Sequence, residues 1–578
     1  MRTIRTALSA FVRVLLDTIA AILGSYYSRK YAETARRLGL SLVEPSTQRG
    51  FIVIQIDGLS YVHLTTAMTQ GRLPYLQRML QRDGCALHPW HSGIPCTTPA
   101  AQAGIMYGNN DDIPAYRWYD KASGESVVCS HPGAIHALQD RISDRQRGIL
   151  VGGSSYMNMF DGDATLSLFT LGAMNRKRFF ESVRGLGFFL LFILNPFRTL
   201  KMLILSLWEY VTDRVQYFTA VVKQRPARPG KGSFAFLRVV SNVILREIQT
   251  FAVMVDIYRG VPAIYTTYLG YDALAHQYGP LSTPALRSLD AVDARIRQID
   301  SFRRFMAPRP YDLFILSDHG MTPSVPFKKT YGQTLGEVVR DLIGDSVRLS
   351  EVLEEDRDSV LQAMYLGNEL DAIEANVRPP LAYIPRAIRE MVMERVRMGE
   401  ALGDGAVDSD HTDLVVRSSG SLSHIYFGAH PEQMDLSQVM TRYPTLVDDL
   451  VSYNGIWLVV GRQNGQVTII SREGAVSVGE DITVEGVNPL DLLPDAGLAA
   501  EQIRRLALFP TSGDLILFGY YDPQRDLVCC FEEQWGSHGG IGGAQETAFM
   551  LMEKQVDWTL EGVSQATEIY DLFISRYR

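Results

Sequence analysis

The stretch Gly50-Phe-Ile-Val-Ile-Gln-Ile56, followed at once by Asp57-Gly58, is the strongest indication of the fold class. A short apolar run rich in β-branched residues, opened by a glycine, is typical of a strand that is buried on both faces of a parallel sheet. Open α/β sheets place ligand chemistry at the carboxyl ends of such strands, which is where Asp57 stands. An aspartate there can equally cap the following helix, so Asp57 alone leaves both interpretations open.

Two later stretches repeat this pattern of a buried strand with a polar end. Ala263 to Leu269 (AIYTTYL) precedes Asp272-x-x-x-His276, and Asp312 to Leu316 (DLFIL) precedes Ser317-Asp318-His319-Gly320. An aspartate and a histidine four residues apart project from one face of a helix and can reach the same ion, although such a pair can also form only a surface hydrogen bond. Near the end of the chain, Ser537-His538-Gly539-Gly540 adds a further histidine. The series predicts a site built from metal ligands.

The segment His91 to Gly108 (HSGIPCTTPAAQAGIMYG) supplies a candidate nucleophile. Thr97 and Thr98 lie between two prolines, directly before a run of small residues that predicts the start of a helix. A threonine in this position commonly caps a helix. The other interpretation is a hydroxyl activated by metal coordination, with helix amides facing an anion. The polar and aromatic stretch Asn109 to Asp120 is expected to be a loop that shapes a substrate pocket.

The composition describes a packed globular protein with an uneven charge distribution. The chain has 578 residues, 46% of them hydrophobic, which fits one large α/β domain with insertions as well as several small domains. Its five cysteines form no zinc-type Cys-x-x-Cys pair and are expected to be buried or reduced thiols. Residues 175–250 hold 13 Lys/Arg against 4 Asp/Glu, and residues 1–39 hold 7 against 2. Since these segments carry +9 and +5 of a net charge of −8, the remainder carries −22.

This distribution indicates a membrane surface rather than a nucleic acid as a partner. No stripe of aromatic and basic residues crosses the acidic remainder, so there is no nucleic-acid-binding signature. The two basic segments are also apolar, which favours anionic lipid head groups. Ala7 to Tyr27 is interrupted by Arg13 and Asp17, which argues against a signal peptide or a span and for an amphipathic helix in the interface. The alternative is a helix packed on the protein itself.

The middle and end of the chain lead to coarser expectations. Residues 140–260 look helical, and Phe188 to Trp208 is expected to form a hairpin that enters one leaflet; a lid or an oligomer interface is the alternative. Residues 335–410 are expected to form an accessory, acidic helical layer. His424 alternates with apolar neighbours and is expected to be structural. Further strands are expected at 414–427, 456–460, 467–471 and 515–521, and a final helix at 563–578.

The ordered motifs resemble the alkaline phosphatase superfamily, and most closely its type I phosphodiesterase/nucleotide pyrophosphatase branch. The resemblance covers about residues 50–120 and 262–334 and resumes near the end of the chain. It implies an α/β fold with a central, mostly parallel sheet flanked by helices and carrying helical insertions. Residues 1–45 are then expected to form an amphipathic, membrane-associated segment. Residues 46–578 would form one catalytic domain, with a basic, apolar insertion at about 140–260 and the accessory region at about 335–410. The motifs that carry the resemblance are Asp57-Gly58, Pro95-Cys-Thr-Thr98, Asp272-x-x-x-His276, Asp318-His319-Gly320 and Ser537-His538-Gly539-Gly540.

The resemblance also implies site residues. The family's nucleophile lies three residues after a proline, which selects Thr98; because Pro99 follows directly and an intervening residue is missing, Thr97 stays as the alternative. Family members stabilise the phosphoryl oxygen with an asparagine after the nucleophile, and Asn109 or Asn110 would serve here at a different spacing. The implied metal ligands are Asp272, His276 and His538 for one ion and Asp57, Asp318 and His319 for the other, with the Thr98 oxygen beside them.

These residues indicate a metal-dependent phosphoesterase. Three histidines and three aspartates suit Zn²⁺ better than Mg²⁺, and paired ions stabilise both the attacking and the leaving oxygen. We therefore expect a phosphodiesterase or pyrophosphatase that forms a phospho-threonine intermediate and acts on nucleotide or lipid-linked esters. A phosphomonoesterase or phosphomutase on the same scaffold, or a non-catalytic membrane scaffold, is the alternative; Cys96 does not begin the sulfatase signature Cys-x-Pro-x-Arg.

The expected location is a membrane surface. The chain would be peripheral or monotopic, and its free thiols and the lack of a signal-peptide pattern favour the cytoplasmic side. Nothing in the sequence indicates an oligomeric state.

Overall fold

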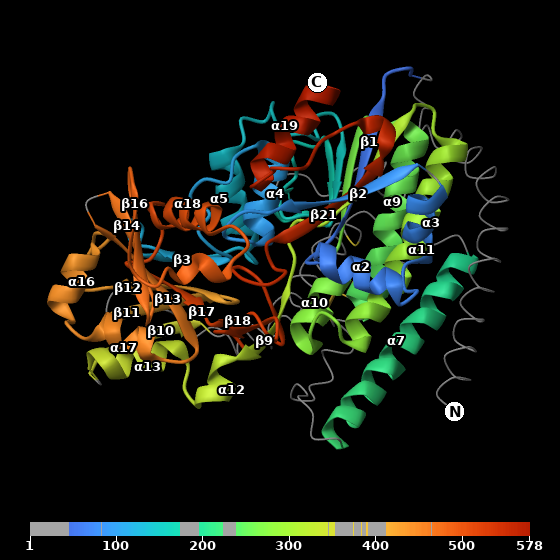
Figure 1. Ribbon diagram of the computed structural model, residues 1–578. Coiled ribbons are helices and arrows are strands. Elements are labelled where there is room, and N and C mark those ends of the chain that lie inside the picture. Colours follow the sequence, from blue (N-terminus) through green and yellow to red (C-terminus); the bar gives the residue numbers. More distant parts are fainter. Residues whose placement is uncertain are drawn as a thin grey trace.

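A seven-stranded sheet forms the centre of one lobe, with the strand order β2-β21-β8-β1-β7-β5-β6 (Figure 1). Strand β1 (Gly50–Ile56) lies between β7 (Ala263–Tyr268) and β8 (Tyr311–Leu316) and pairs with both in parallel. Every residue of these three strands is buried, as expected for apolar strands covered on both faces. The predicted α/β fold with a mostly parallel central sheet is therefore confirmed.

The computed structural model describes residues 46–173, 196–222, 239–352 and 412–578, apart from positions 83, 345 and 464, together with residues 374, 383, 386, 389 and 390. The predictions for residues 1–45, for the first part of the expected hairpin and for most of residues 353–411 lie outside the described residues.

The edges of the central sheet come from stretches that were not predicted to be strands. On one side, β5 (Ser154–Tyr156) and β6 (Leu166–Leu168) extend the sheet in parallel. On the other side, β21 (Thr547–Glu553) is antiparallel both to β8 and to β2 (Cys85–His91). Strands of three residues are too short to show an alternating pattern. Part of the range expected to be a helical insertion, 140–260, thus contributes strands to the central sheet.

Helices cover both faces of this sheet (Figure 1). Helix α4 (Thr98–Tyr107) packs against the C-terminal helix α19 (Ala566–Tyr577), and the prediction of a final helix is confirmed. A second group is centred on α11 (Thr283–Met306), which packs against α10 (Gly270–Tyr278) and α9 (Arg246–Arg259). The same group includes α3 (Pro74–Arg82), which follows α2 (Tyr61–Thr69).

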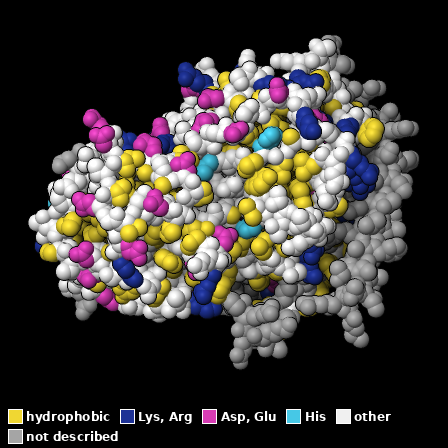
Figure 2. Space-filling view, in the orientation of Figure 1, with side chains coloured by type: hydrophobic (Ala, Val, Ile, Leu, Met, Phe, Trp, Pro, Cys, Tyr) yellow, Lys and Arg dark blue, Asp and Glu magenta, His cyan; other side chains and the backbone are white. Residues whose placement is uncertain are grey.

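A second sheet of eight strands, in the order β10-β11-β12-β17-β13-β14-β15-β16, forms the other lobe. Two separate clusters of buried apolar side chains pack around it. Strands occur at all four places where the sequence predicted them. On the face shown in Figure 2, acidic side chains gather over this lobe, in line with the −22 carried by most of the chain. The strand bounds are β10 (Leu349–Val352), β11 (Leu414–Ser419), β12 (Leu422–Phe427), β13 (Ile456–Gln463), β14 (Gln466–Ile470), β15 (Gly474–Val478), β16 (Ile482–Gly486) and β17 (Leu515–Gly519).

Two local expectations were wrong. The range 335–410 was expected to be helical, and α13 (Leu335–Ile343) fits, but Leu349–Val352 is strand β10, which pairs in parallel with β11. The range 109–120 was expected to be a loop, but its end, Arg117–Asp120, is strand β3, paired with β4 (Glu125–Val128). The partner of β10 lies far along the chain, outside the local window from which a sequence pattern is read, whereas β3 pairs locally with β4 but is too short to show an alternating pattern.

Helix α7 (Pro196–Val222) runs along the outside of the central-sheet lobe (Figure 1). It is continuous through Trp208, where the expected hairpin would end, so the described half of that segment is one long helix. Large apolar side chains along it are exposed: Leu200, Leu203, Ile204, Leu207, Trp208, Val211, Val215 and Phe218. None of the helices in the described ranges is long and apolar enough to cross a membrane.

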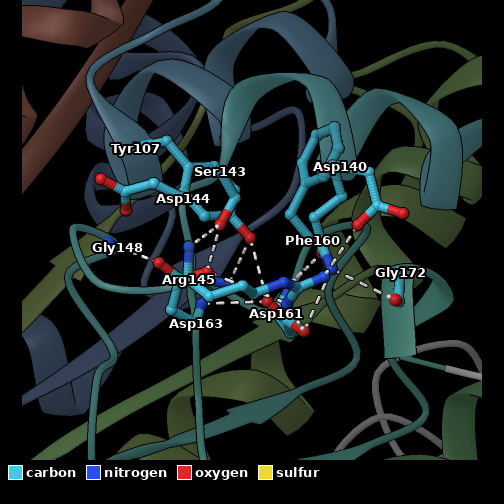
Figure 3. A network of polar contacts seen from close by, with 12 residues as sticks. Tyr107, Asp140, Ser143, Asp144, Arg145, Gly148, Phe160, Asp161, Asp163 and Gly172 are labelled. Atoms are coloured by element: carbon cyan, nitrogen blue, oxygen red, sulfur yellow. Dashed lines mark hydrogen bonds and ion pairs between the residues drawn. The ribbon is translucent and has the colours of Figure 1, made fainter. Parts of the chain in front are cut away.

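A polar cluster around Arg145 fixes the loops that lead into β5 and β6 (Figure 3). The Arg145 guanidinium lies 2.8 Å from Asp161 and 3.4 Å from Asp140, and Asp161 also accepts a hydrogen bond from the Tyr107 hydroxyl at 3.0 Å. Asp163 accepts from the backbone N–H of Gly148 at 2.8 Å. This cluster joins α4 and α5 (Pro132–Ile142) to the edge strands, so it holds the short strands in place without a long pairing ladder.

Candidate two-metal site

Polar residues from three neighbouring strands meet at one edge of the central sheet. Asp57 follows β1, Asp318 and His319 follow β8, and α10, which follows β7, carries Asp272 and His276. Because these strands are parallel neighbours, their carboxyl ends lie side by side. His538 reaches the same place from the glycine-rich stretch after the second lobe, and a cavity opens there, lined by Asp57, Thr98, Asp272, His276 and His538 among others. All seven residues singled out in the sequence are therefore close together.

Asp57, Asp318 and His319 form one compact group, with a ligand atom of each within 4.8 Å of the others. The Nε2 atom of His319 lies 3.5 Å from Asp318 Oδ2 and 4.0 Å from Asp57 Oδ1. The hydroxyl oxygen of Thr98 lies 3.1 Å from the same Nε2 atom and 3.4 Å from Asp57 Oδ1. This group brings together the residues that the resemblance assigned to one ion and to the nucleophile.

Asp272, His276 and His538 form the second group. His276 Nε2 lies 3.2 Å from Asp272 Oδ2 and 3.1 Å from His538 Nε2, and His538 Nε2 lies 3.9 Å from Asp272 Oδ1. Ligand atoms of His319, Asp272 and His538 also lie within 4.8 Å of one another. The His319 ring stacks on that of His538, with centroids 3.9 Å apart. His319 thus stands between the two groups, which adjoin one another.

The three histidines share one orientation. In each, Nδ1 faces a backbone carbonyl oxygen: His276 that of Gly536 at 2.8 Å, His319 that of Gly320 at 2.8 Å, and His538 that of Cys96 at 2.9 Å. A carbonyl oxygen can only accept, so Nδ1 carries the proton and donates it, which leaves the Nε2 lone pair directed at the centre of the site. Metal-binding histidines are commonly held by this kind of hydrogen bond from their other ring nitrogen.

The centre of the site has the donor atoms that divalent cations require. Two accepting nitrogens, His276 Nε2 and His538 Nε2, lie 3.1 Å apart, where their lone pairs repel unless a cation or proton lies between them. Asp272 Oδ1 and Asp318 Oδ2 are buried and accept no hydrogen bond from the described residues. Buried carboxylate oxygens without donors are costly, and a bound cation would stabilise them. The residues present therefore fit two divalent ions.

The protonation states favour the same conclusion. Burial raises the pKa of Asp272, but any positive charge on the imidazoles of His276, His538 and His319 lowers it, and the net shift is to below the usual carboxylate range, so Asp272 is ionised. Burial lowers the pKa of His538 well below its ordinary value, and the neighbouring His319 and His276 lower it further, so its imidazole is neutral. An ionised carboxylate and a neutral imidazole are the ligand forms that bind metal ions.

Glycines let these side chains approach one another. Gly58 has φ +66° and donates its N–H to Asp318 Oδ1 at 3.3 Å. A Cβ atom at this position would collide with Asp272 Oδ1, so a side chain here would displace that carboxylate. Gly539 has φ +103° and donates its N–H to the buried Cys96 thiol at 3.1 Å. The turn after His538 is thereby tied to the residue before Thr97. The glycines of both motifs are needed for the backbone to bring His538 to Asp272.

The structure separates the two candidate threonines. Thr98 is the first residue of α4, and its hydroxyl faces Asp57 and His319. Thr97 occupies the N-cap position, but its hydroxyl makes no capping hydrogen bond and meets no hydrogen-bonding partner among the described residues. Neither threonine acts as a side-chain cap, so the capping interpretation explains neither hydroxyl. Geometry places Thr98, and not Thr97, against the ligand groups.

The two asparagines expected to stabilise the phosphoryl oxygen do not line the cavity. The side-chain oxygen of Asn110 accepts a hydrogen bond from Arg505 at 2.7 Å, and that of Asn109 accepts one from the backbone of Asp111. Asn158 lines the cavity instead, but its amide nitrogen donates to Ser155 Oγ at 2.7 Å and to the Tyr265 carbonyl. The expectation for Asn109 and Asn110 therefore finds no support in the geometry.

The cavity wall contains a buried ion pair that was not predicted from the sequence. Arg117 and Glu532, each 2% exposed, both line the cavity and form an ion pair with one another. Ser419 Oγ accepts from the backbone N–H of Arg117, and the Arg117 guanidinium donates to the Ser418 carbonyl at 2.6 Å. Glu532 accepts from the Gly420 N–H. The pair joins residues more than 400 positions apart, so no local pattern could reveal it.

Comparisons with known proteins found distant relatives. No family model matches the sequence. The human ectonucleotide pyrophosphatase/phosphodiesterase family member 1 is 26% identical over 147 residues, which are 24% of this chain and 15% of that protein. Phosphonoacetate hydrolase from Sinorhizobium meliloti 1021 aligns with 93% of this chain and all of its own, at 14% identity and a TM-score of 0.42. Murine ectonucleotide pyrophosphatase/phosphodiesterase 5 aligns over 92% and 95% of the two chains, at 9% identity and a TM-score of 0.42.

The name of the human relative agrees with the ordered motifs. It is a nucleotide pyrophosphatase/phosphodiesterase, which is the branch of the alkaline phosphatase superfamily that the motifs of this chain resemble. Over the 147 matched residues, the chain is therefore similar in sequence to a member of that branch. The match to the human relative spans only 15% of its length, so its activity does not transfer directly to this chain.

Proposed function

We propose that this chain, as a relative of the phosphodiesterase branch of the alkaline phosphatase superfamily, is a metal-dependent phosphoesterase with Thr98 as its nucleophile. One observation carries the proposal. The Thr98 hydroxyl lies 3.1 Å from His319 Nε2 and 3.4 Å from Asp57 Oδ1, at the N-terminal end of α4. A hydroxyl among metal ligands and at a helix N-terminus has both an activating and an anion-binding environment.

The six ligands would hold two divalent ions, and their chemistry favours Zn²⁺. Zinc accepts imidazole nitrogens and carboxylate oxygens together, whereas Mg²⁺ and Ca²⁺ prefer oxygen ligands. The ligand sets are Asp57, Asp318 and His319 for one ion and Asp272, His276 and His538 for the other. When bound, the ions would supply charge stabilisation at the phosphoryl oxygens and lower the pKa of the attacking hydroxyl.

The chain's own groups define the remaining chemistry. Thr98 Oγ would form a bond to phosphorus while the bond to the leaving oxygen breaks, which gives a phospho-threonine that water then hydrolyses. The first N–H groups of α4 would face the phosphoryl oxygens. The carbonyl oxygens of Gly536, Gly320 and Cys96 keep each imidazole oriented through the reaction.

The proposed substrates are phosphodiesters or pyrophosphates of the nucleotide or lipid-linked type. The name of the human relative supports nucleotide pyrophosphates and phosphodiesters. The Arg117–Glu532 pair supports a substrate with a polar group beside the scissile phosphate, because both side chains are fixed in the cavity wall. A buried arginine held in this way loses little further side-chain freedom when a polar group binds beside it.

We also propose that the enzyme works at a membrane surface, on the cytoplasmic side, as a peripheral or monotopic protein. The exposed apolar side chains of α7 support this, among them Leu207 at 67% and Phe218 at 63% exposure. The surplus of +9 within residues 175–250 supports an anionic surface. An amphipathic helix that lies in the interface combines these two properties.

The catalytic proposal is tested by metal analysis and by hydrolysis of bis- and mono-p-nitrophenyl phosphate. The purified protein should contain about two equivalents of zinc and should prefer the diester. Thr98→Ala should retain its metal but lose at least about 1,000-fold in kcat. Thr97→Ala, the matched control, should retain most activity. Preference for the monoester would favour a phosphomonoesterase, and an inactive but metal-loaded wild type would favour a non-catalytic scaffold.

A further inference from the structure

A second polar cavity lies at the opposite end of the central sheet from the candidate metal site. It has a volume of about 530 Å³ and is lined chiefly by Arg49, Arg303, Arg304, Arg309 and Glu553. Arg49 directly precedes β1 and Arg309 shortly precedes β8, whereas Asp57 and Asp318 follow the other ends of these strands. A strand of this length spans roughly 20 Å, so the two cavities are separate.

Three of the four arginines have carboxylate partners. Arg303 joins the end of α11 to β21 through Glu553, Arg49 joins the segment before β1 to β8 through Asp312, and the two pairs with Asp300 lie within α11. Arg303 also donates to the Tyr311 carbonyl oxygen at the start of β8. The pairs are Arg49 with Asp312 at 2.8 Å, Arg303 with Asp300 at 2.7 Å and with Glu553 at 2.8 Å, and Arg304 with Asp300 at 2.9 Å.

Arg309 differs from these three. Its Nε and Nη1 atoms are shielded from water and meet no acceptor among the residues that the structure describes. Pro308 and Pro310 flank it, and the ring of a proline restricts the backbone both of its own residue and of the residue before it. The backbone that carries this cavity-lining side chain is thus stiff. Buried N–H donors are rarely left without an acceptor, so these donors indicate an absent partner.

The local charge gives the sign of that partner. Arg576 also pairs with Asp312, at 3.1 Å, so four guanidinium groups share the three carboxylates Asp300, Asp312 and Glu553, and Arg309 adds a fifth positive charge. The carbonyl end of α11 faces the same region and does not attract anions. The attraction must therefore come from the arginine side chains, and Arg309 is the one whose charge is not already matched by a carboxylate.

We propose that this cavity is an oxyanion site in which Arg309, with Arg49 beside it, binds a phosphate group. A planar guanidinium fork matches the spacing of phosphate oxygens and forms charge-assisted hydrogen bonds with them. The phosphate could be free in solution or be carried by the head group of an anionic phospholipid. This inference does not rest on the proposed catalytic function, because no residue of this cavity belongs to the candidate metal site.

The test is calorimetric titration of inorganic phosphate into the metal-loaded, full-length protein. Wild type should bind one more equivalent of phosphate than Arg309→Gln. Arg525→Gln is the matched control, since Arg525 is an exposed surface arginine that pairs with Asp522 outside the cavity, and it should behave as wild type. Arg49→Gln, at a half-exposed side chain, should weaken the extra site about tenfold and keeps the test valid if Arg309→Gln fails to fold.

A second arm separates the two sources of phosphate. Sedimentation with phosphatidylcholine vesicles, with and without phosphatidic acid, should show weaker binding of Arg309→Gln to the acidic vesicles if a lipid head group is the ligand. If only the titration with inorganic phosphate changes, free phosphate is the ligand. Equal phosphate stoichiometry and equal vesicle binding for wild type, Arg309→Gln and Arg49→Gln would overturn the proposal.

Discussion

At the scale of single residues, His538 is the side chain on which the candidate site depends most. It arrives from a distant part of the chain and contacts both other histidines: His276 Nε2 at 3.1 Å and the ring of His319 at 3.9 Å between centroids. Its Nδ1 donates to the Cys96 carbonyl, just before the two threonines. It therefore links the second ligand group to the segment that carries Thr97 and Thr98.

We predict that His538→Ala leaves the fold intact but removes about one of two metal equivalents, since each tetrahedral ion depends on three protein ligands. Activity on bis-p-nitrophenyl phosphate should fall at least about 100-fold, as electrostatic stabilisation at the reacting phosphate is lost. Metal analysis and circular dichroism check both parts. His430→Ala, at an exposed histidine, is the control and should change neither. An unfolded His538→Ala, or one with full metal content, would be inconsistent with the assignment.

Among the elements, β12 carries a histidine with a structural role, as its alternation with apolar residues predicted. His424 is fully buried; its Nδ1 accepts from the Gly513 N–H at 3.0 Å, and its Nε2 donates to the Pro114 carbonyl at 3.2 Å. Burial lowers the pKa of His424 to about 4. A proton on Nδ1 would place two hydrogen-bond donors, the His424 ring and the Gly513 N–H, opposite one another, so the folded state keeps this ring neutral.

We therefore predict that acid destabilises the fold through this strand. Between the unfolded pKa of about 6.5 and the folded pKa of about 4, only the unfolded chain binds the proton. The contribution of neutral His424 to the free energy of unfolding is complete above pH 6.5. It is lost as the pH drops, and the loss from this one group reaches about 3 kcal/mol. His63, whose pKa burial also lowers to about 4, should add to the effect. Urea unfolding at several pH values should show that His424→Asn loses less stability on acidification than wild type; an equal loss would refute this.

Helix α7 exposes a run of large apolar side chains. Residues at spacings of three and four, from Leu200 to Phe218, form an exposed apolar stripe. We predict that Leu203→Glu with Leu207→Glu abolishes sedimentation with phosphatidylglycerol vesicles and leaves hydrolysis of soluble diesters unchanged. The matched control is Val487→Glu with Leu492→Glu, at exposed apolar positions on the other lobe. Binding that survives in the α7 variant would exclude this helix as the membrane contact.

At the scale of the whole molecule, the site lies where two lobes meet. The central sheet provides the strand ends with Asp57 and Asp318, while the second lobe provides Ser419, Gly420 and Glu532 in the cavity wall. A Cβ at Gly420 would collide with the His538 carbonyl oxygen, so the turn between β11 and β12 packs directly against the segment that carries the last ligand. The second sheet thus positions His538 as well as lining the cavity.

The sequence was sufficient to predict some levels of this organisation and not others. Strands β1, β7 and β8 were predictable because their apolar runs are local and each ends in a ligand motif. The ligand groups followed from the parallel arrangement, which places those ends together. The parallel β10–β11 pairing and the Arg117–Glu532 ion pair depend on partners far apart in the chain, and no periodicity encodes such pairings. His319's place between the two ligand groups likewise required coordinates, because sequence spacing does not fix interatomic distance.

The most direct test of the account is to trap the covalent intermediate. Metal-loaded protein mixed with bis-p-nitrophenyl phosphate and quenched in acid should yield one phosphorylated peptide from residues 91–108, with the phosphoryl group on Thr98 as located by mass spectrometry. The same experiment with Thr97→Ala should give the same modification, and Thr98→Ala should give none. A phosphoryl group on any other residue, or undiminished turnover by Thr98→Ala, would contradict the central claim that Thr98 is the nucleophile of a phosphoesterase.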